Sequence, residues 1–192
     1  MDLAGSGERT SVRGVPSYSR RVWGNERSWI RGAQRGSVPD LEQLFRAHWP
    51  RAYRAAYLIV HDAAAAEDIA QESFIAAVRA LERFDRHRPF GPWLHRIVAN
   101  RAIDWARART ARAEVELGEP PASFDERTDD GDAAPIAAAL LELSPEHRAV
   151  IVLRYLLDYT PGEIADLLEL PRGTVNSRLR RGLDQLGSQL GE

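Results

Sequence analysis

Apolar residues recur at intervals of three and four along most of this chain. That spacing places them on one face of a helix, whereas a half-buried strand would alternate apolar and polar residues. No segment alternates convincingly in this way. The pattern therefore predicts an all-α protein.

Three helices are predicted between residues 40 and 112. The first begins at Asp40, and we expect Pro50 to kink or restart it, because proline cannot donate a backbone hydrogen bond. The third runs from about 93 to 112, after a loop over 84–92 that is rich in proline and glycine. The second runs from about 64 to 84, with a predicted buried stripe of Ala70, Phe74, Ala77, Val78 and Leu81.

Four short helical stretches are predicted after residue 135. Ser144 followed by Pro145 is typical of a helix start, because serine caps free backbone N–H groups and proline fits the first turn. Residues 160–163, Thr-Pro-Gly-Glu, have the pattern of a capping box. The last two stretches meet across residues 169–171, which is the short spacing of a helix-turn-helix.

Composition and charge divide the chain into four parts. Residues 1–39 are rich in glycine, serine and arginine without a sustained period, which predicts a disordered or loosely held leader. Residues 113–135 hold eight acids against one arginine, together with several prolines. They predict a flexible acidic linker between two small helical domains, 40–112 and 136–192.

The two domains each carry an excess of arginine. Residues 83–112 have eight arginines against two aspartates, and residues 170–186 have four against one. Two basic blocks separated by an acidic spacer indicate a protein that touches nucleic acid at two places.

Composition also excludes several functions. The chain has no cysteine, which rules out disulfides and thiolate chemistry, and its five histidines lack the spacing of metal ligands. We therefore expect no metal and no cofactor. No apolar run approaches the roughly 20 residues that span a bilayer, and no secretory signal is recognisable, so we expect a cytoplasmic protein without membrane insertion.

The last predicted helix has the side chains of a DNA-reading helix. One side is apolar, with Val175, Leu179, Leu183 and Leu186. Arginine forks can bind guanine edges, and hydroxyls reach phosphates or bases in the major groove. An ordinary surface helix with a solvated basic face is the alternative. The candidate DNA-binding residues are Arg172, Thr174, Ser177, Arg178, Arg180 and Arg181.

The first domain offers two further candidate surfaces. Asp68, Gln71, Glu72 and Ile75 share one face of the second helix, and an apolar residue within a polar stripe indicates protein docking, although single exposed hydrophobes are common. Aromatic and arginine side chains beside a flexible loop suit unpaired bases, which stack on rings. These candidates are Phe84, Arg86, His87, Arg88, Trp93, Arg96 and Asn100.

Three runs in this chain resemble motifs of one family. Residues 66–74, AEDIAQESF, are similar to the region 2 signature of the extracytoplasmic-function (ECF) sigma factors, in the sigma-70 family of RNA polymerase sigma subunits. Residues 93–100, WLHRIVAN, followed by Asp104, resemble the next part of region 2, and residues 173–179, GTVNSRL, resemble region 4. The resemblance covers roughly residues 40–190.

The resemblance implies a promoter-specificity subunit without catalytic residues of its own. The motif positions Asp68, Gln71 and Glu72 would contact the clamp coiled coil of the polymerase β′ subunit. The 84–92 loop and the start of the third helix would melt and capture the −10 element. Region 4 would read the −35 duplex and rest on the β flap, and an anti-sigma factor would hold the protein inactive.

Two departures from the family pattern stand in the second domain. Glu169 occupies the helix-turn-helix turn where glycine is frequent, and Asn176 stands where a basic residue is frequent.

Two rival functions are a stand-alone helix-turn-helix regulator, which would leave the first domain without a function, and an enzyme. The neighbouring carboxylates Glu67 and Asp68 would point about 100° apart on a helix, which argues against paired acid–base catalysis.

Overall fold

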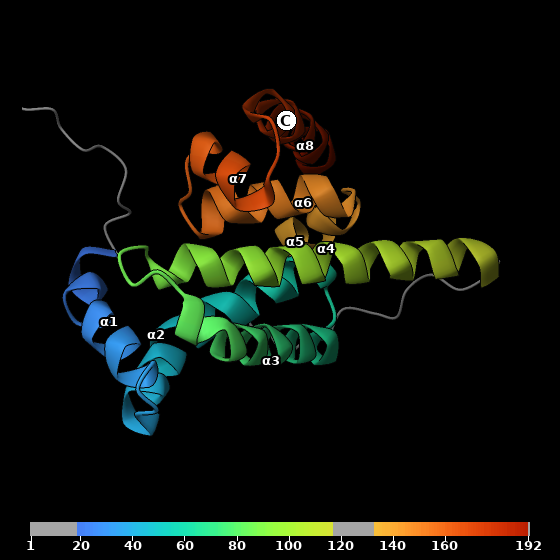
Figure 1. Ribbon diagram of the computed structural model, residues 1–192. Coiled ribbons are helices and arrows are strands. Elements are labelled where there is room, and N and C mark those ends of the chain that lie inside the picture. The colour runs from blue at the N-terminus through green and yellow to red at the C-terminus, as the bar shows by residue number, and fades with distance from the viewer. Residues whose placement is uncertain (1–18, 117–132, 192) are drawn as a thin grey trace, which may run out of the picture.

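The computed structural model describes residues 19–116 and 133–191, and every regular element in this part of the chain is helical. The predicted all-α fold is confirmed there (Figure 1). The elements include a short 3₁₀ turn, η1, and a π-helical turn, η2. In chain order they are α1 Ser19–Ala33, α2 Val38–Val60, α3 Ala63–Ala80, η1 Leu81–Arg83, α4 Phe90–Glu116, α5 Ala133–Leu141, α6 Pro145–Ile151, η2 Val152–Leu156, α7 Pro161–Leu168 and α8 Arg172–Leu190.

Helices α2, α3 and α4 pack together as the first domain. Ser37 caps α2 by accepting a hydrogen bond from the backbone N–H of Asp40. The helix then continues through Pro50, so the predicted restart does not occur. Pro50 lies on the exposed side, where water can bind the backbone carbonyl that proline leaves without a donor.

Helix α1 corrects the prediction of a disordered leader for residues 19–39. Ile30 is fully buried, and Nε2 of His48 in α2 donates a hydrogen bond of 2.8 Å to Oε1 of Glu26, with both side chains buried. Trp29 and Ala33 pack against the core beside Ile30, but Glu26 and Gln34, the residue after the helix, are inward-facing and polar. These polar positions interrupt the apolar stripe, so the hydrophobic pattern missed this helix. Residues 1–18 of the predicted leader lie outside the described part of the chain.

The second domain consists of α5 to α8. The capping box predicted at the start of α7 is confirmed, since Thr160 and Glu163 hydrogen-bond each other's backbone N–H. Val175 and Leu179 of α8 face the core as expected, but Leu183 is 41% exposed. Gly182 faces α6 in its place, and a Cβ there would lie only 2.7 Å from Cδ1 of Ile151, so a side chain at 182 would require Ile151 to shift.

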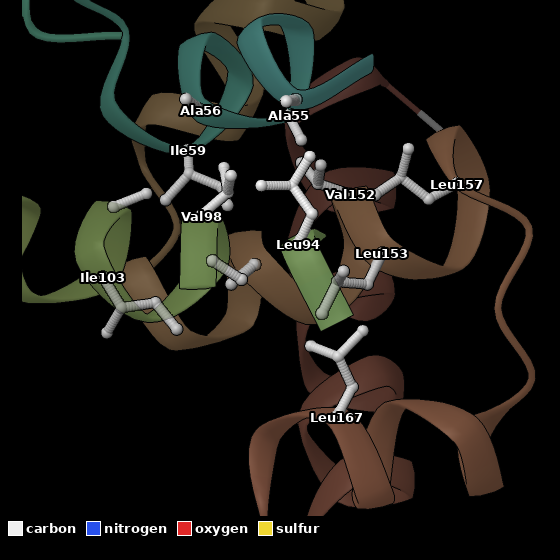
Figure 2. Packing of buried hydrophobic residues seen from close by; sticks show 14 of the residues in the cluster. Ala55, Ala56, Ile59, Leu94, Val98, Ile103, Val152, Leu153, Leu157 and Leu167 are labelled. Carbon is white, nitrogen blue, oxygen red and sulfur yellow. The ribbon is translucent and has the colours of Figure 1, made fainter. Parts of the chain in front are cut away.

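The two domains share one apolar core. Figure 1 shows the long helix α4 lying between α2 and α3 on one side and the second domain on the other. Ile59 of α2 and Leu94 and Val98 of α4 are fully buried there, close to Val152 and Leu153 of the second domain (Figure 2). The domains are therefore packed against each other. From the sequence, only a flexible linker over 113–135 was predicted to connect them.

Most of the predicted acidic linker, 113–135, lies outside the described residues. Helix α4 extends to Glu116, a few residues into the predicted linker, and α5 begins at Ala133. At the other end, α4 begins at Phe90 rather than Trp93, which shortens the predicted 84–92 loop to residues 84–89.

Polar contacts also join the domains. Arg148 of α6 is buried and donates to the backbone carbonyl of Ile59 in α2 at 2.5 Å. Nδ1 of His95 in α4 and the hydroxyl of Tyr159 are joined by a buried hydrogen bond of 2.7 Å. Burial lowers the pKa of His95 to about 3, so this ring is neutral inside the interface at neutral pH.

Candidate nucleic-acid and partner interfaces

The outer face of α3 presents the residues that the sequence assigned to protein docking. Asp68, Gln71, Glu72 and Ile75 are all exposed, because α3 turns its alanines and Phe74 towards the core. Nη1 of Arg101 in α4 lies 2.5 Å from a carboxylate oxygen of Glu72, in an exposed ion pair that contributes little stability. The four predicted residues thus share one accessible face.

An apolar groove of about 510 Å³ adjoins this face. It lies between α2 and α3, and Ile75, 42% exposed, belongs to its wall. Val78, predicted to be buried, is 39% exposed and lines the groove as well. Gln71, Glu42 and Arg79 supply its polar edge, and the remaining lining residues are Val38, Leu41, Phe45 and Phe74.

The α2 wall of this groove was missed by the sequence-based prediction. Val38 lies within the leader that was predicted to be disordered, and Leu41 and Phe45 contribute only to the helical period of the first predicted helix. Val38 is 72% exposed and Phe45 is 40% exposed. An apolar stripe does not reveal whether the protein's own core or a partner covers it, and only the packing of α2 and α3 separated these cases.

The loop between η1 and α4, residues 84–89, presents basic side chains to solvent. Arg86, His87 and Arg88 are exposed. Asp85 shapes this turn, since its carboxylate accepts from the backbone N–H of His87 at 2.9 Å and its carbonyl accepts from that of Arg88 at 2.9 Å. The three predicted residues therefore stand on a turn with defined geometry.

The two predicted aromatic residues stack on each other at the base of this loop. The rings of Phe84 and Trp93 are stacked with centroids 4.4 Å apart, and both are half-buried. Phe90, which is buried, packs edge-on against both rings. The structure thus brings Phe84 and Trp93 into one aromatic platform beside the basic turn.

Two predicted residues of α4 differ in their availability. Asn100 is exposed. Arg96 is half-buried, and its Nη2 lies 2.5 Å from a carboxylate oxygen of Glu169 in the second domain. In this arrangement of the domains the guanidinium of Arg96 is occupied by a protein carboxylate.

Glu169 lies in the turn of the helix-turn-helix, as predicted. Its backbone adopts the left-handed region, with φ 55° and ψ 43°, and its N–H bonds the carbonyl of Ala165. This is the left-handed conformation that glycine adopts without strain, so Glu169 takes at this position the backbone conformation typical of glycine.

Helix α8 directs its arginines away from the core. Arg172, Ser177, Arg180 and Arg181 are exposed, and Thr174 and Arg178 are half-buried. Within the described residues no carboxylate forms an ion pair with these arginines. The pKa of His147 beside them is lowered, mainly by burial and then by Arg178. This face therefore combines positive charge with unoccupied donors, which suits a phosphate-bearing surface.

The described residues contain no group of three or more histidine, aspartate or glutamate side chains placed to hold a metal ion. A helix both long and apolar enough to cross a membrane is likewise absent from this part of the chain.

Comparisons with known proteins match both domains. The family model for Sigma-70 region 2 matches residues 44–112, and that for Sigma-70, region 4 matches residues 133–186. The ECF RNA polymerase sigma factor SigW of Bacillus subtilis (strain 168) is 32% identical over 176 residues, covering 84% of this chain and 94% of SigW. The RNA polymerase sigma factor CarQ of Myxococcus xanthus is 33% identical over 163 residues, covering 82% and 92%.

Solved structures match the arrangement of the helices. CnrH, in complex with the cytosolic domain of CnrY, has a TM-score of 0.66 and 30% identity over 86% of this chain and 96% of CnrH. The sigma factor RpoE of Bartonella quintana, in complex with the anti-sigma factor NepR, has a TM-score of 0.67 over 80% and 98%. At 22% identity, this second likeness supports the fold alone.

Proposed function

The chain belongs to the extracytoplasmic-function sigma factors of the sigma-70 family, and from this premise we propose that it binds RNA polymerase core and directs promoter recognition, DNA melting and initiation. The observation that carries this proposal is the match of both domains, in order, to sigma regions 2 and 4. A stand-alone helix-turn-helix regulator is set aside, because it would leave the region 2 domain without a function.

Core polymerase docks on the outer face of α3 and the adjoining apolar groove. The polar residues Asp68, Gln71 and Glu72 surround Ile75, so a helical partner can bury its apolar side chains in the groove and pair its basic ones at the rim. This proposal adds Val38 and Phe45 of α2 to the residues assigned from the sequence. The partner element is the β′ clamp coiled coil.

Promoter DNA binds at two places. The basic turn of residues 84–89, the Phe84–Trp93 platform and Asn100 take the melted −10 element, where unpaired bases stack on aromatic rings. The exposed arginines of α8 read the −35 duplex. Arg96 takes part only when its ion pair with Glu169 opens, which links −10 binding to separation of the domains.

Further contacts complete the proposal. The β flap supports the second domain on polymerase, and an anti-sigma factor holds the protein inactive. Because polymerase and promoter DNA are cytoplasmic in bacteria, the protein works in that compartment. It contributes no catalytic group.

Polymerase binding can be tested with Ile75→Asp, which places a charge in the groove without touching the core of the domain. We expect at least a tenfold loss of affinity for bacterial core polymerase, because a buried carboxylate without a partner costs more than 1.4 kcal/mol. Affinity is measured by fluorescence anisotropy of labelled chain titrated with core, and run-off transcription measures the functional consequence. Ala111→Asp, which adds the same charge at an exposed position of α4, is the control for the introduced carboxylate.

Binding to core with promoter-specific transcripts, lost in Ile75→Asp and kept in Ala111→Asp, supports the proposal. A folded wild-type chain that fails to associate with core would overturn it. If the two variants bound core polymerase with equal affinity, the docking surface would lie outside the groove.

A further inference from the structure

Helix α1 lies outside both matched family regions, yet it contacts the base of the 84–89 loop. In Figure 1, α1 lies at the end of the molecule where α3 passes into α4. We propose that α1 is a positioning element for this loop, with Gln34 holding the start of the loop and Glu26, through His48, holding its end. This inference rests on the proposed function, because it assigns the loop to the melted −10 element.

Gln34 fixes the first residues of the loop. Its side-chain Nε2 donates to the backbone carbonyl of Leu81 at 3.0 Å and to that of Phe84 at 2.9 Å. These two carbonyls mark the point where η1 ends and the backbone becomes extended, with Phe84 at φ −71° and ψ 130°. Helix ends leave carbonyls without intrahelical partners. Here Gln34, 50 residues earlier in the chain, binds the carbonyl of Phe84, and it adds a second donor to the carbonyl of Leu81, which also accepts from the backbone N–H of Phe84 at 3.0 Å.

Gln34 is itself held in place by the end of α1. The backbone N–H of Ser37 bonds the carbonyl of Gly32 at 3.0 Å, and that of Gly36 bonds the carbonyl of Ala33 at 3.0 Å. Gly36 has φ +85°, so the helix ends in a Schellman motif that requires a left-handed residue. Ser37 then caps α2, and the short connection leaves Gln34 little freedom.

The end of the loop is held by a second contact of α1. Oε1 of Glu26 accepts from Nε2 of His48, which orients the buried imidazole. That ring packs against Phe90, with centroids 5.2 Å apart, and a Cβ at Gly91 would lie 3.2 Å from its Cε1. Glu26 thus acts through His48 on the first two residues of α4.

The spacing of Glu26 and Gln34 allows both contacts to be made from one side of α1. Glu26, Ile30 and Gln34 are spaced by four residues, so they lie along one stripe of the helix, and the ends of this stripe are about 12 Å apart. Ile30, fully buried, anchors its middle. Because α1 holds both ends of the loop, the Phe84–Trp93 stack and the basic turn keep a fixed relation to each other.

The role of Gln34 is tested with Gln34→Met, which keeps the size of the side chain and removes its donor. We expect faster amide hydrogen exchange confined to residues 81–91 in the free chain, because the carbonyl of Phe84 loses the side chain that binds it and the carbonyl of Leu81 keeps only the backbone N–H of Phe84. In holoenzyme, we expect promoter opening to slow by about tenfold, as followed by 2-aminopurine fluorescence in the −10 element. Affinity for core and for a −35 duplex should stay unchanged.

Two further variants distinguish positioning from general stability. Gln43→Met makes the same exchange at an exposed position of α2 and should behave like wild type. Gln34→Lys keeps an N–H donor and should restore most of the opening rate. On a promoter that is already mismatched across the −10 element, the base pairs need not be opened. The difference in rate between Gln34→Met and wild-type holoenzyme should therefore shrink.

Unchanged exchange at residues 81–91 and normal opening by Gln34→Met would overturn the inference while leaving the proposed function intact. Opening that slows together with a matching loss of core affinity or a general rise in exchange would also overturn it, because Gln34 would then be a stability residue. If the wild-type holoenzyme neither forms nor opens a promoter, the proposed function fails, and the exchange measurement alone decides whether α1 holds the loop.

Discussion

Arg148 is a buried charged residue that is bound by backbone carbonyls. Its guanidinium is buried and donates to four backbone carbonyls, those of Ile59, Leu140, Leu141 and Leu143. Among the described residues no carboxylate forms an ion pair with it, and burial lowers its pKa to about 10. The partial negative charges at the ends of α5 and α2 take the place of a counter-ion.

Replacement of Arg148 by Met should lower the free energy of unfolding by about 3 kcal/mol, because several buried carbonyls would lose their donors at once. Urea unfolding followed by circular dichroism measures this loss. Arg180→Met, at an exposed position of α8, is the control and should stay within about 0.5 kcal/mol of wild type. A loss below about 1 kcal/mol for Arg148→Met would mean that water replaces the guanidinium.

At the scale of one element, α8 combines a packing face with the arginine-bearing face that is proposed to read DNA, here called the reading face. Val175, Leu179 and Gly182 bring it close to the rest of the second domain, which leaves the arginines on the opposite side. The capping box of α7 and the left-handed Glu169 fix the angle at which α8 leaves the turn. The reading face is therefore set by short-range contacts that sequence patterns describe well.

Arg178→Ala should weaken binding to the −35 duplex by about 1–3 kcal/mol if this side chain reads a guanine edge. Fluorescence anisotropy with the promoter duplex and with a scrambled duplex, at one salt concentration, measures the loss and its specificity. Gln189→Ala, exposed near the end of the same helix, should leave both affinities unchanged. An equal loss on both duplexes would indicate that Arg178 contacts phosphate only.

At the scale of the whole molecule, the two domains are closed on each other. The proposed promoter contacts at two separate elements would part the domains, expose Leu94, Val98 and Leu153, and break the His95–Tyr159 and Arg96–Glu169 contacts. The apolar contacts are insensitive to pH. The buried, neutral His95 makes the closed state respond to acid.

Acid should favour opening of the domains. His95 has a pKa of about 3 in the closed state, where burial dominates and His48 and Arg51 act in the same direction, but about 6.5 once exposed. The open state therefore binds more protons, and the closed state loses stability as the pH falls from about 6.5 towards 3. The loss amounts to about 2 kcal/mol at pH 5.

The opening can be measured by energy transfer between dyes on cysteines introduced at Gln43 and Gln189, both exposed, since the sequence has no cysteine. His95→Gln should remove most of the pH dependence, and His87→Gln, in the exposed loop, should leave it unchanged. The same pH response in wild type and His95→Gln would assign it to other groups.

Local patterns in the sequence determined much of this protein. The helical period, the capping residues and the charge blocks predicted the all-α fold, the helix-turn-helix and the exposed face of α3. These features depend on residues close together in the chain, whose spacing alone decides which face of a helix they share. The family motifs added the expected role of each face.

Only the tertiary structure decided which apolar positions are covered and which polar ones are buried. Val78 and Leu183 are exposed, whereas Glu26, His48 and Arg148 are inside. The helix α1 escaped prediction because Glu26, and Gln34 directly after the helix, face inward although they are polar, and they find their partners 22 to 50 residues away. Burial of a polar side chain depends on partners that lie far along the chain, and local spacing carries no information about them.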